Sequence, residues 1–387
     1  MPSADVIRAI HASGCRAVLA VTGGGSGAIS RLLEVPGASR TVLAAAVPYS
    51  AAALARWLGA KPEQSCSAAT ARAMAMVAFV RARELAPQEP AAAHLGVACS
   101  ASLASDRPKR GEHRIHVATH SSHATAVWSI TLAKGRRTRA EEEAVAAGLV
   151  LDALAAGSGL RAAGQGRLAG LDADERLERD EARATDELAQ LLVGQAAKVI
   201  LGAGPAGALS SDAPLPVVFP GAFNPVHAGH LRMAAAAEAR LGLPAAWELS
   251  VTNVDKPALD FIAIRDRVAG LQGDAKRRPI ALTRAATFRE KAALFPGSVF
   301  VVGADTLVRI GDVRYYGGET LRRDAVIREI AAQSCRFLAF GRVVGGQFQR
   351  ADELDLPAAL RALCDVVPES EFRADVSSTE LRARQPE

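Results

Sequence analysis

A short buried strand that leads through a glycine-containing loop into a helix is the feature that most constrains the fold. Residues 216–219 are apolar and predict the strand, and the helix begins near His230 and ends before Gly242. Gly221 and Gly229 lie in the loop between them. This βα unit predicts a doubly wound α/β sheet with a ligand crevice at the carboxyl ends of its strands.

Apolar runs alternate with helical patterns along the rest of the chain. Residues 17–21 and 298–302 predict further buried strands, and residues 140–156 predict a helix. With 387 residues, the chain is too long for one ordinary core. We therefore expect an α/β protein with two domains, each a mainly parallel sheet flanked by helices. The predicted boundaries are 1–160 for the first domain, 161–214 for a charged and then Gly/Pro-rich connector, and 215–387 for the second domain.

Charge and cysteine content narrow the functional classes. Lys and Arg total 46 against 41 Asp and Glu, a net charge of +5 that is not gathered in one block. This favours anionic small molecules over nucleic acid as partners. The five dispersed cysteines form no CxxC pair, which indicates reduced thiols in the cytoplasm. Residues 213–231 are uncharged but rich in proline, so neither they nor any other segment predicts a membrane span.

The loop has the residues expected at a phosphate site. Gly221 and Gly229 permit close approach of a ligand to the backbone. The start of the following helix presents free N–H groups and a positive dipole end. His227 and His230 are spaced so that both imidazoles reach one phosphate. The alternative is that these histidines are simply a turn residue and a helix cap.

The ten residues 221–230 resemble the nucleotidylyltransferase superfamily, and within it the nicotinate/nicotinamide mononucleotide adenylyltransferases. The resemblance implies a Rossmann-like C-terminal domain in which His227 and His230 act at the α-phosphate of ATP. Asn224 stands where other branches usually carry Asp, which favours the pyridine nucleotide branch. Four loop residues are implied to bind ATP: Gly221, Phe223, Asn224 and Gly229.

A second motif lies near the C-terminus. Ser377 and Glu380 have capping-box spacing and predict a helix start, which on its own is an ordinary capped terminal helix. Residues 376–382 resemble the superfamily's triphosphate-binding motif. The resemblance implies that three further residues bind ATP: Ser378, Thr379 and Arg382.

Three residues are candidates for binding the acceptor. A strand ends at Gly303, which places the Asp305 carboxylate at the crevice, where it meets ribose hydroxyls or a substrate amide. A helix-capping role is the alternative for Asp305. Lys256 follows another strand and is either a phosphate ligand or a solvated loop residue.

The resemblance implies transfer of AMP from ATP to nicotinamide or nicotinate mononucleotide, with release of pyrophosphate. The acceptor phosphate is already anionic, so no general base is required. Mg²⁺ is expected on the ATP phosphates, and no protein metal site is predicted. Two alternatives remain open: a nucleotidylyltransferase with CTP or another phosphorylated acceptor, and a nucleotide-binding regulator with little turnover.

The first domain resembles the CinA C-terminal, or nicotinamide mononucleotide amidohydrolase, family through the glycine-rich residues 22–27 and Tyr49. The family's serine nucleophile is replaced by Ala20, its cysteine by Val21 and its lysine by Leu54. Since alanine cannot attack an amide, we expect no deamidase activity there. A binding role, or a role in forming a homo-oligomer, is left open. The nearby histidines His113, His116, His120 and His123 are expected to be separate residues rather than a metal site.

Overall fold

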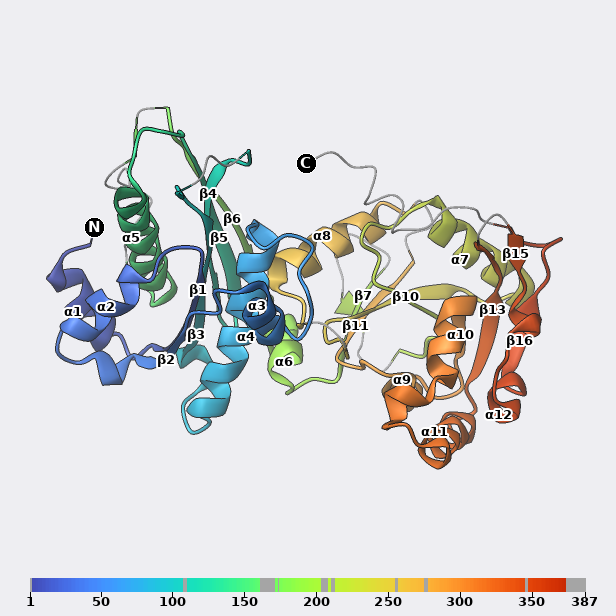
Figure 1. Cartoon of the computed structure of the whole chain (residues 1–387). Coiled ribbons are helices and arrows are strands. Elements are labelled where there is room, and N and C mark those ends of the chain that lie inside the picture. The colour runs from blue at the N-terminus through green and yellow to red at the C-terminus, as the bar shows by residue number, and fades with distance from the viewer. Residues whose placement is uncertain are drawn as a thin grey trace. The chain divides into compact units, whose positions relative to one another are not determined.

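The computed structural model contains two compact units, one formed by Met1–Val193 with Asp255–Ile264 and the other by Gly194–Val254 with Arg265–Glu387 (Figure 1). We call them unit 1 and unit 2. Both are α/β, as predicted, and the chain passes between them three times. The structure describes residues 2–106, 110–160, 171–172, 174–202, 208–209, 213–254, 257–274, 278–344 and 347–373.

Unit 1 contains a six-stranded sheet in the order β2-β1-β3-β4-β5-β6. Along a strand, every second side chain belongs to one buried cluster and the side chains between them point to the opposite face of the sheet. The strands are β1 (Arg16–Thr22), β2 (Val42–Ala46), β3 (His94–Ser102), β4 (His113–His120), β5 (Ala124–Leu132) and β6 (Leu177–Arg183).

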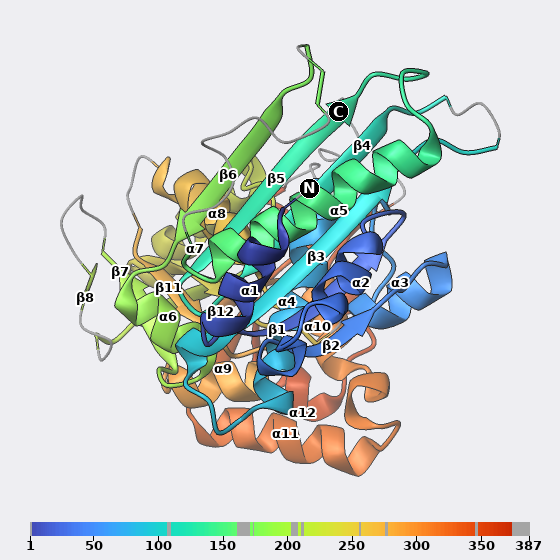
Figure 2. The same ribbon diagram turned by 90° about the vertical axis from the view of Figure 1, so that its left-hand side faces the viewer.

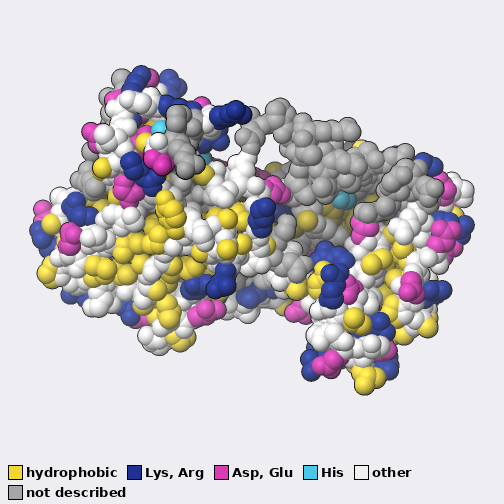
Figure 3. Space-filling view, viewed as in Figure 1, with side chains coloured by type: hydrophobic (Ala, Val, Ile, Leu, Met, Phe, Trp, Pro, Cys, Tyr) yellow, Lys and Arg dark blue, Asp and Glu magenta, His cyan; other side chains and the backbone are white. Residues whose placement is uncertain are grey.

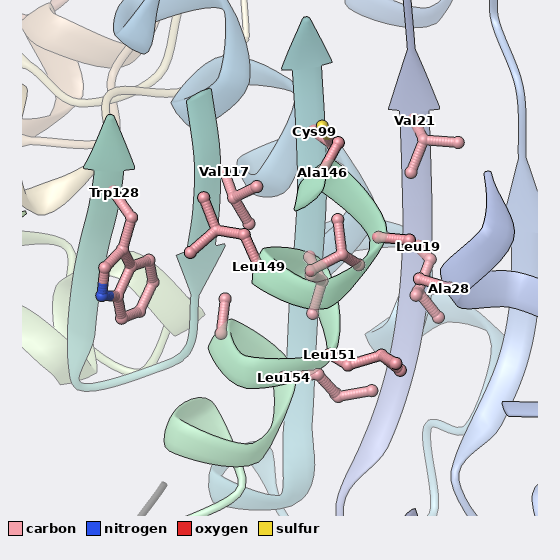
Figure 4. Close-up of a cluster of buried hydrophobic side chains, with 14 of the residues drawn as sticks. Leu19, Val21, Ala28, Cys99, Val117, Trp128, Ala146, Leu149, Leu151 and Leu154 are labelled. Carbon is pink, nitrogen blue, oxygen red and sulfur yellow. The ribbon is translucent and has the colours of Figure 1, made fainter. Parts of the chain in front are cut away.

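Helices cover both faces of this sheet. Figure 2 shows α5 lying along one face, and Figure 4 shows Leu149 of α5 next to Val117 of the sheet, both in the same buried cluster. The helix α4 packs on β3 and β4. The helices of unit 1 are α1 (Ala4–Ala12), α2 (Gly27–Glu34), α3 (Ala51–Leu58), α4 (Ala68–Leu85), α5 (Arg139–Gly157) and α6 (Asp186–Val193), with short 3-10 turns η1 (Ala38–Arg40) and η2 (Ala91–Ala93).

The first sheet is mixed rather than mainly parallel. β1 pairs in parallel with β2 and β3, but β3–β4, β4–β5 and β5–β6 are antiparallel. Antiparallel pairing needs only a short connection, and residues 121–123 suffice between β4 and β5. In addition, β6 lies in the stretch predicted as a connector, where mixed charges suit an edge strand exposed to water.

Unit 2 contains an eight-stranded sheet in the order β16-β13-β12-β9-β10-β11-β7-β8. Its first six strands are parallel, as predicted, and β7 and β8 join in antiparallel pairing. The strands are β7 (Lys198–Leu201), β8 (Ala208–Leu209), β9 (Val217–Pro220), β10 (Ala245–Ser250), β11 (Ile280–Thr283), β12 (Val299–Gly303), β13 (Arg336–Phe340) and β16 (Cys364–Val367); β14 (Arg342–Val344) and β15 (Gln347–Gln349) form a separate hairpin.

The core of unit 2 packs helices against the parallel strands. Phe300 and Phe337 contact Phe288 in edge-on ring pairs, with ring centroids 5.6 and 5.5 Å apart. The helices are α7 (Ala228–Leu241), α8 (Phe261–Gln272), α9 (Phe288–Leu294), α10 (Ala304–Gly311), α11 (Thr320–Ala332) and α12 (Ala358–Arg361), with turns η3 (Val313–Tyr316) and η4 (Ala351–Glu353). The helix α10 was not predicted, because it is only eight residues long and begins directly after β12 with no loop between them.

The strand order of unit 2 reverses between β9 and β12. From β9 the chain proceeds outward through β10 and β11, and from β12 it proceeds the other way through β13 and β16. In such sheets the ligand crevice lies outside the carboxyl ends of the strands at this reversal. The loop after β9 and the residues after β12 therefore share the edge where a ligand is expected.

The surface carries charges of both signs. Among the described residues on the face shown in Figure 3, Lys and Arg side chains lie between Asp and Glu side chains on both units, and hydrophobic side chains gather on unit 1. Large apolar side chains exposed on unit 1 are Leu33, Val47, Tyr49, Val80 and Leu85. None of the described helices has both the length and the apolar run that crossing a bilayer requires.

Candidate active site

The loop of residues 221–227 connects β9 to α7 at the strand-order reversal. Gly221 N–H donates to the carbonyl oxygen of Glu248 in β10 at 3.0 Å, which ties the start of the loop to the neighbouring strand. His227 is extended and directly precedes α7. The 14-residue helix therefore begins at the loop and directs its positive dipole end there.

The two predicted catalytic histidines lie together at this helix start. Their ring centroids are 3.7 Å apart and the planes differ by 26°. The backbone N–H of His227 donates to Nδ1 of His230 at 3.3 Å, so the proton of the neutral His230 ring is on Nε2. Burial, with a smaller contribution from His227, lowers the pKa of His230 to about 4, and burial also lowers the pKa of His227. Both rings are neutral hydrogen-bond donors at neutral pH.

Aromatic side chains pack against the loop and against His230. Phe223 is 2% exposed, and its ring lies edge-on to Trp247 at 5.0 Å and to His230 at 5.2 Å. Its φ of 44° is in the left-handed region, which is uncommon for a phenylalanine. A Cβ at Gly221 would come within 2.5 Å of the Phe223 ring, so this glycine is required by packing. The side chain of Phe223 thus orients His230.

One arginine that the sequence did not point to also holds the loop. Arg267 of α8 donates from Nη1 to the carbonyl oxygen of Ala222 at 3.1 Å. The two residues are 45 positions apart in the chain, and no motif joins them. The packing of α8 against the loop, which only the fold reveals, brings them together.

The predicted acceptor residues follow β12. Gly303 is the last residue of β12 and the N-cap of α10, and Asp305 lies in the first turn of that helix. Since β12 and β9 are adjacent parallel strands, Asp305 and the loop belong to the same edge of the sheet. Asn224 is exposed in the loop, whereas Gly229 is buried in the first turn of α7. The other predicted ligands, Lys256, Ser378, Thr379 and Arg382, lie outside the described residues.

The glycine-rich turn of unit 1 is filled by a carboxylate of the protein itself. Glu143 of α5 accepts hydrogen bonds from Gly25 N–H at 2.8 Å, Gly27 N–H at 3.1 Å and the Ser26 hydroxyl at 3.0 Å. A Cβ at Gly23 would lie 1.8 Å from the carbonyl oxygen of Ala101, so packing accounts for that glycine. The turn binds an anion, as its backbone suggests, but the anion is a side chain of α5.

The residues that replace the resembled amidohydrolase machinery are buried. Ala20 and Val21 lie in β1 and Leu54 in α3, all at most 2% exposed. The histidines of β4 have separate partners: His113 pairs with Glu142, His116 with the Ser129 hydroxyl and His120 with the Thr125 hydroxyl. Across the described segments, no three His, Cys, Asp or Glu side chains come together in a way that could hold a metal ion.

Two relationships to known proteins come from the sequence. The cytidylyltransferase-like family matches residues 218–384. A probable nicotinate-nucleotide adenylyltransferase from Gloeobacter violaceus (strain ATCC 29082 / PCC 7421) is 31% identical over 180 residues, which cover 43% of this chain and 81% of that protein.

Two solved structures are similar to part of the chain. The competence/damage inducible protein CihA from Agrobacterium tumefaciens has 23% sequence identity and a TM-score of 0.33, with 41% of this chain and 97% of the other covered. A competence-damaged protein (CinA) superfamily member from Escherichia coli has 16% identity and a TM-score of 0.30, with 40% and 84% covered.

The match over 218–384 spans the loop, both histidines and Asp305, and the Gloeobacter protein is matched over four fifths of its length. The chain therefore belongs to the cytidylyltransferase-like nucleotidyltransferases, in the family that contains the probable nicotinate-nucleotide adenylyltransferases.

Proposed function

We propose that this chain transfers AMP from ATP to nicotinate or nicotinamide mononucleotide, forming a dinucleotide and pyrophosphate. The observation that carries the proposal is the pair of neutral imidazoles, His227 and His230, at the start of α7 beside the strand-order reversal. The name of the Gloeobacter relative supports a pyridine mononucleotide as acceptor. The resemblance of Asn224 and Pro225 to the pyridine branch points the same way.

The reaction requires positioning and charge stabilisation more than acid–base chemistry. A phosphate oxygen of the acceptor forms a bond to the α-phosphorus of ATP, and the bond from that phosphorus to the β-phosphate oxygen breaks. Pyrophosphate leaves with the bonding electron pair. The imidazole N–H groups of His227 and His230 donate to the α-phosphate oxygens, where negative charge increases in the transition state.

The remaining predicted ligands complete the proposal. The loop residues Gly221, Phe223, Asn224 and Gly229 would hold ATP. The leaving pyrophosphate would be held by Ser378, Thr379 and Arg382. Gly303, Asp305 and Lys256 contact the acceptor. Mg²⁺ would be carried mainly by the ATP phosphates and would neutralise part of their charge, a donor set that needs no cluster of protein carboxylates.

Product formation tests this proposal directly. The protein is incubated with Mg²⁺, ATP and either the amide or the acid mononucleotide, and dinucleotide and pyrophosphate are measured. Product from either acceptor supports the function, and the faster one identifies the substrate. If neither reacts while ATP still binds, the pyridine acceptor is wrong, and CTP and other phosphorylated acceptors are tried next.

One substitution separates an enzyme from a nucleotide-binding regulator. His230→Ala removes the Nε2 donor, and we expect kcat to fall about 10²- to 10³-fold. The exposed His123 of unit 1 gives a matched control, and His123→Ala should retain full activity. A regulator would instead show little turnover in the parent protein and only a modest change in ATP affinity in His230→Ala.

A further inference from the structure

Arg278 is a buried cation of unit 2 that the proposed reaction does not use. It lies two residues before β11, and its side chain is 3% exposed. Its Nε and Nη2 atoms donate to the two carboxylate oxygens of Glu238 in α7, both at 2.8 Å, and its Nη1 donates to Asp274. Taking these charges out of water costs free energy that the ion pairs repay only in part, so stability alone does not account for the cluster.

The guanidinium of Arg278 also lies over the indole ring of Trp247 in β10. Its Cζ atom is 5.5 Å from the ring centroid, which is within the range of a cation–π contact. The backbone N–H of Trp247 donates to the carbonyl oxygen of Pro279 at 2.8 Å, so the sheet holds Trp247 beside the residue that follows the arginine. Trp247 is fully buried, and its Nε1 has no hydrogen-bond partner among the described residues. Ring contacts therefore hold the indole in place.

The other ring contacts of Trp247 lead to the histidine pair. Its ring centroid lies 5.3 Å from that of Phe219 in β9 and 5.0 Å from that of Phe223 in the loop. Both phenylalanine rings lie edge-on to the imidazole of His230, at 6.1 and 5.2 Å. The three rings form one packed aromatic cluster next to His230, and Arg278 contacts the indole of this cluster.

The same arginine holds the helix that begins at the histidine pair. Glu238 lies on α7, eight residues after His230, and its Oε1 also accepts the N–H of Ala245, the first residue of β10, at 3.2 Å. A planar guanidinium binds a carboxylate through two parallel hydrogen bonds in one orientation, so this contact restricts sliding and rotation of α7 against β10. Arg278 therefore acts on His230 by two routes, through α7 and through Trp247.

We propose that Arg278 and Trp247 are positioning residues that hold the imidazole of His230 in the orientation in which its Nε2 donates to the α-phosphate. Arg278 fixes α7 through Glu238, and Trp247 fixes the ring of Phe223. All of these residues belong to unit 2. A shift of about 1 Å in a group at the reacting atoms can lower the rate about 10²-fold. The inference rests on the proposed function for its kinetic consequence.

Two substitutions in the full-length protein test the two routes. Arg278→Lys keeps the positive charge but loses the planar pair of N–H groups that binds Glu238. Trp247→Phe keeps an aromatic ring but leaves a space beside Phe223, and the N–H that it removes bonds to none of the described residues. The measurements are kcat and KM for ATP, the pKa of the His230 ring by NMR titration, and the unfolding temperature.

Each substitution has a matched control. Arg289→Lys changes an arginine whose ion pair with Glu329 is exposed to solvent, and it should leave all kinetic values unchanged. Trp128→Phe changes a tryptophan of unit 1 that is also buried and has an arginine over its ring, with Cζ of Arg179 5.3 Å from the centroid. This variant measures what the loss of a buried indole does to stability without any contact to His230.

We expect kcat to fall about tenfold in Arg278→Lys and in Trp247→Phe, with KM for ATP within about threefold of the parent, because the contact that is lost strengthens in the transition state. Both controls should stay within about twofold in kcat. Loosening the aromatic cluster admits water to His230, so its pKa should rise from about 4 toward 6.5 in the two variants and in neither control. A role in stability alone would lower the unfolding temperature and leave this pKa unchanged.

Unchanged kcat and an unchanged pKa of His230 in both variants would overturn the inference. If either variant does not fold, Glu238→Gln takes its place, since glutamine still accepts a hydrogen bond from Arg278 but loses the charge. Glu238→Gln should move kcat and the pKa in the same directions, and unchanged values decide against the inference. If the parent protein forms no dinucleotide, the proposed function fails, and the pKa of His230 then decides alone whether Arg278 and Trp247 hold the ring.

Discussion

His230 is held as a neutral ring by its surroundings. It is packed edge-on against Phe223 and stacked on His227, and its Nδ1 accepts a backbone hydrogen bond. Burial therefore lowers its pKa to about 4 from an ordinary value of 6.5. A triphosphate bound against Nε2 favours the charged ring, so nucleotide binding should raise this pKa.

An NMR titration of the His230 ring checks this, with the signal assigned from His230→Asn. We expect a midpoint near pH 4 in the free protein and a higher midpoint with ATP bound. Because the complex then binds more protons than the free protein, the contribution of His230 to ATP affinity should decrease as the pH rises above about 4. A midpoint that ATP leaves unchanged would show that His230 does not contact the phosphates.

At the scale of elements, local patterns predicted β9, its loop and α7 well. The apolar run, the glycines and the proline determine the strand, the loop and the helix start through local effects. The helix α7 nevertheless begins at Ala228, two residues before the expected start. The antiparallel direction of β4–β6 was not predictable, because apolar runs specify a strand and not its neighbour. The contact of Glu143 with the turn near Gly25 also depends on tertiary packing, since 118 positions separate them.

Glu143 should stabilise unit 1 by accepting hydrogen bonds from the backbone N–H groups of the turn before α2. Glu143→Ala leaves the Gly25 and Gly27 N–H groups without their acceptor, and we expect a loss of about 1–3 kcal/mol in the free energy of unfolding. Hydrogen exchange of the β1 and β3 amides measures this loss of stability. Glu84→Ala, at an exposed position of α4, is the control and should change stability by less than about 0.5 kcal/mol.

Added inorganic phosphate extends this test. If the turn is an anion site occupied by Glu143, phosphate should restore part of the stability of Glu143→Ala and have no effect on the parent protein. Equal stability of Glu143→Ala and Glu84→Ala would mean that the carboxylate is dispensable and that the turn is stabilised by packing alone.

At the scale of the whole molecule, the boundary between the units is discontinuous. The sequence predicted two α/β domains divided by one connector, whereas β6 and α6 of that stretch fold in unit 1 and β7 folds in unit 2. The assignment of residues 257–264 to unit 1 could not be predicted, because their apolar residues equally suit a helix of either unit. The contacts of the segment with Thr125, His120 and Arg72 distinguish the two.

A fragment that begins at Gly194 should therefore be less stable than unit 2 is in the full chain. It would expose Phe261, Ile262 and Ile264, which are nearly inaccessible in the 387-residue chain. We expect the fragment to bind a hydrophobic dye more strongly and to unfold at a lower temperature. Replacing these three residues with serine should reduce dye binding. A fragment as stable as the intact chain would contradict the structural role of the segment.

The discontinuous unit also sets an order of events during synthesis. Unit 1 ends its first segment at Val193, but its last segment, ending at Ile264, is translated roughly 70 residues later. At about 5–20 residues per second, this interval lasts several seconds, during which the positions later filled by Phe261 and Ile262 are open to solvent. Folding of the N-terminal half on the ribosome is thus incomplete until part of the transferase has left the exit tunnel.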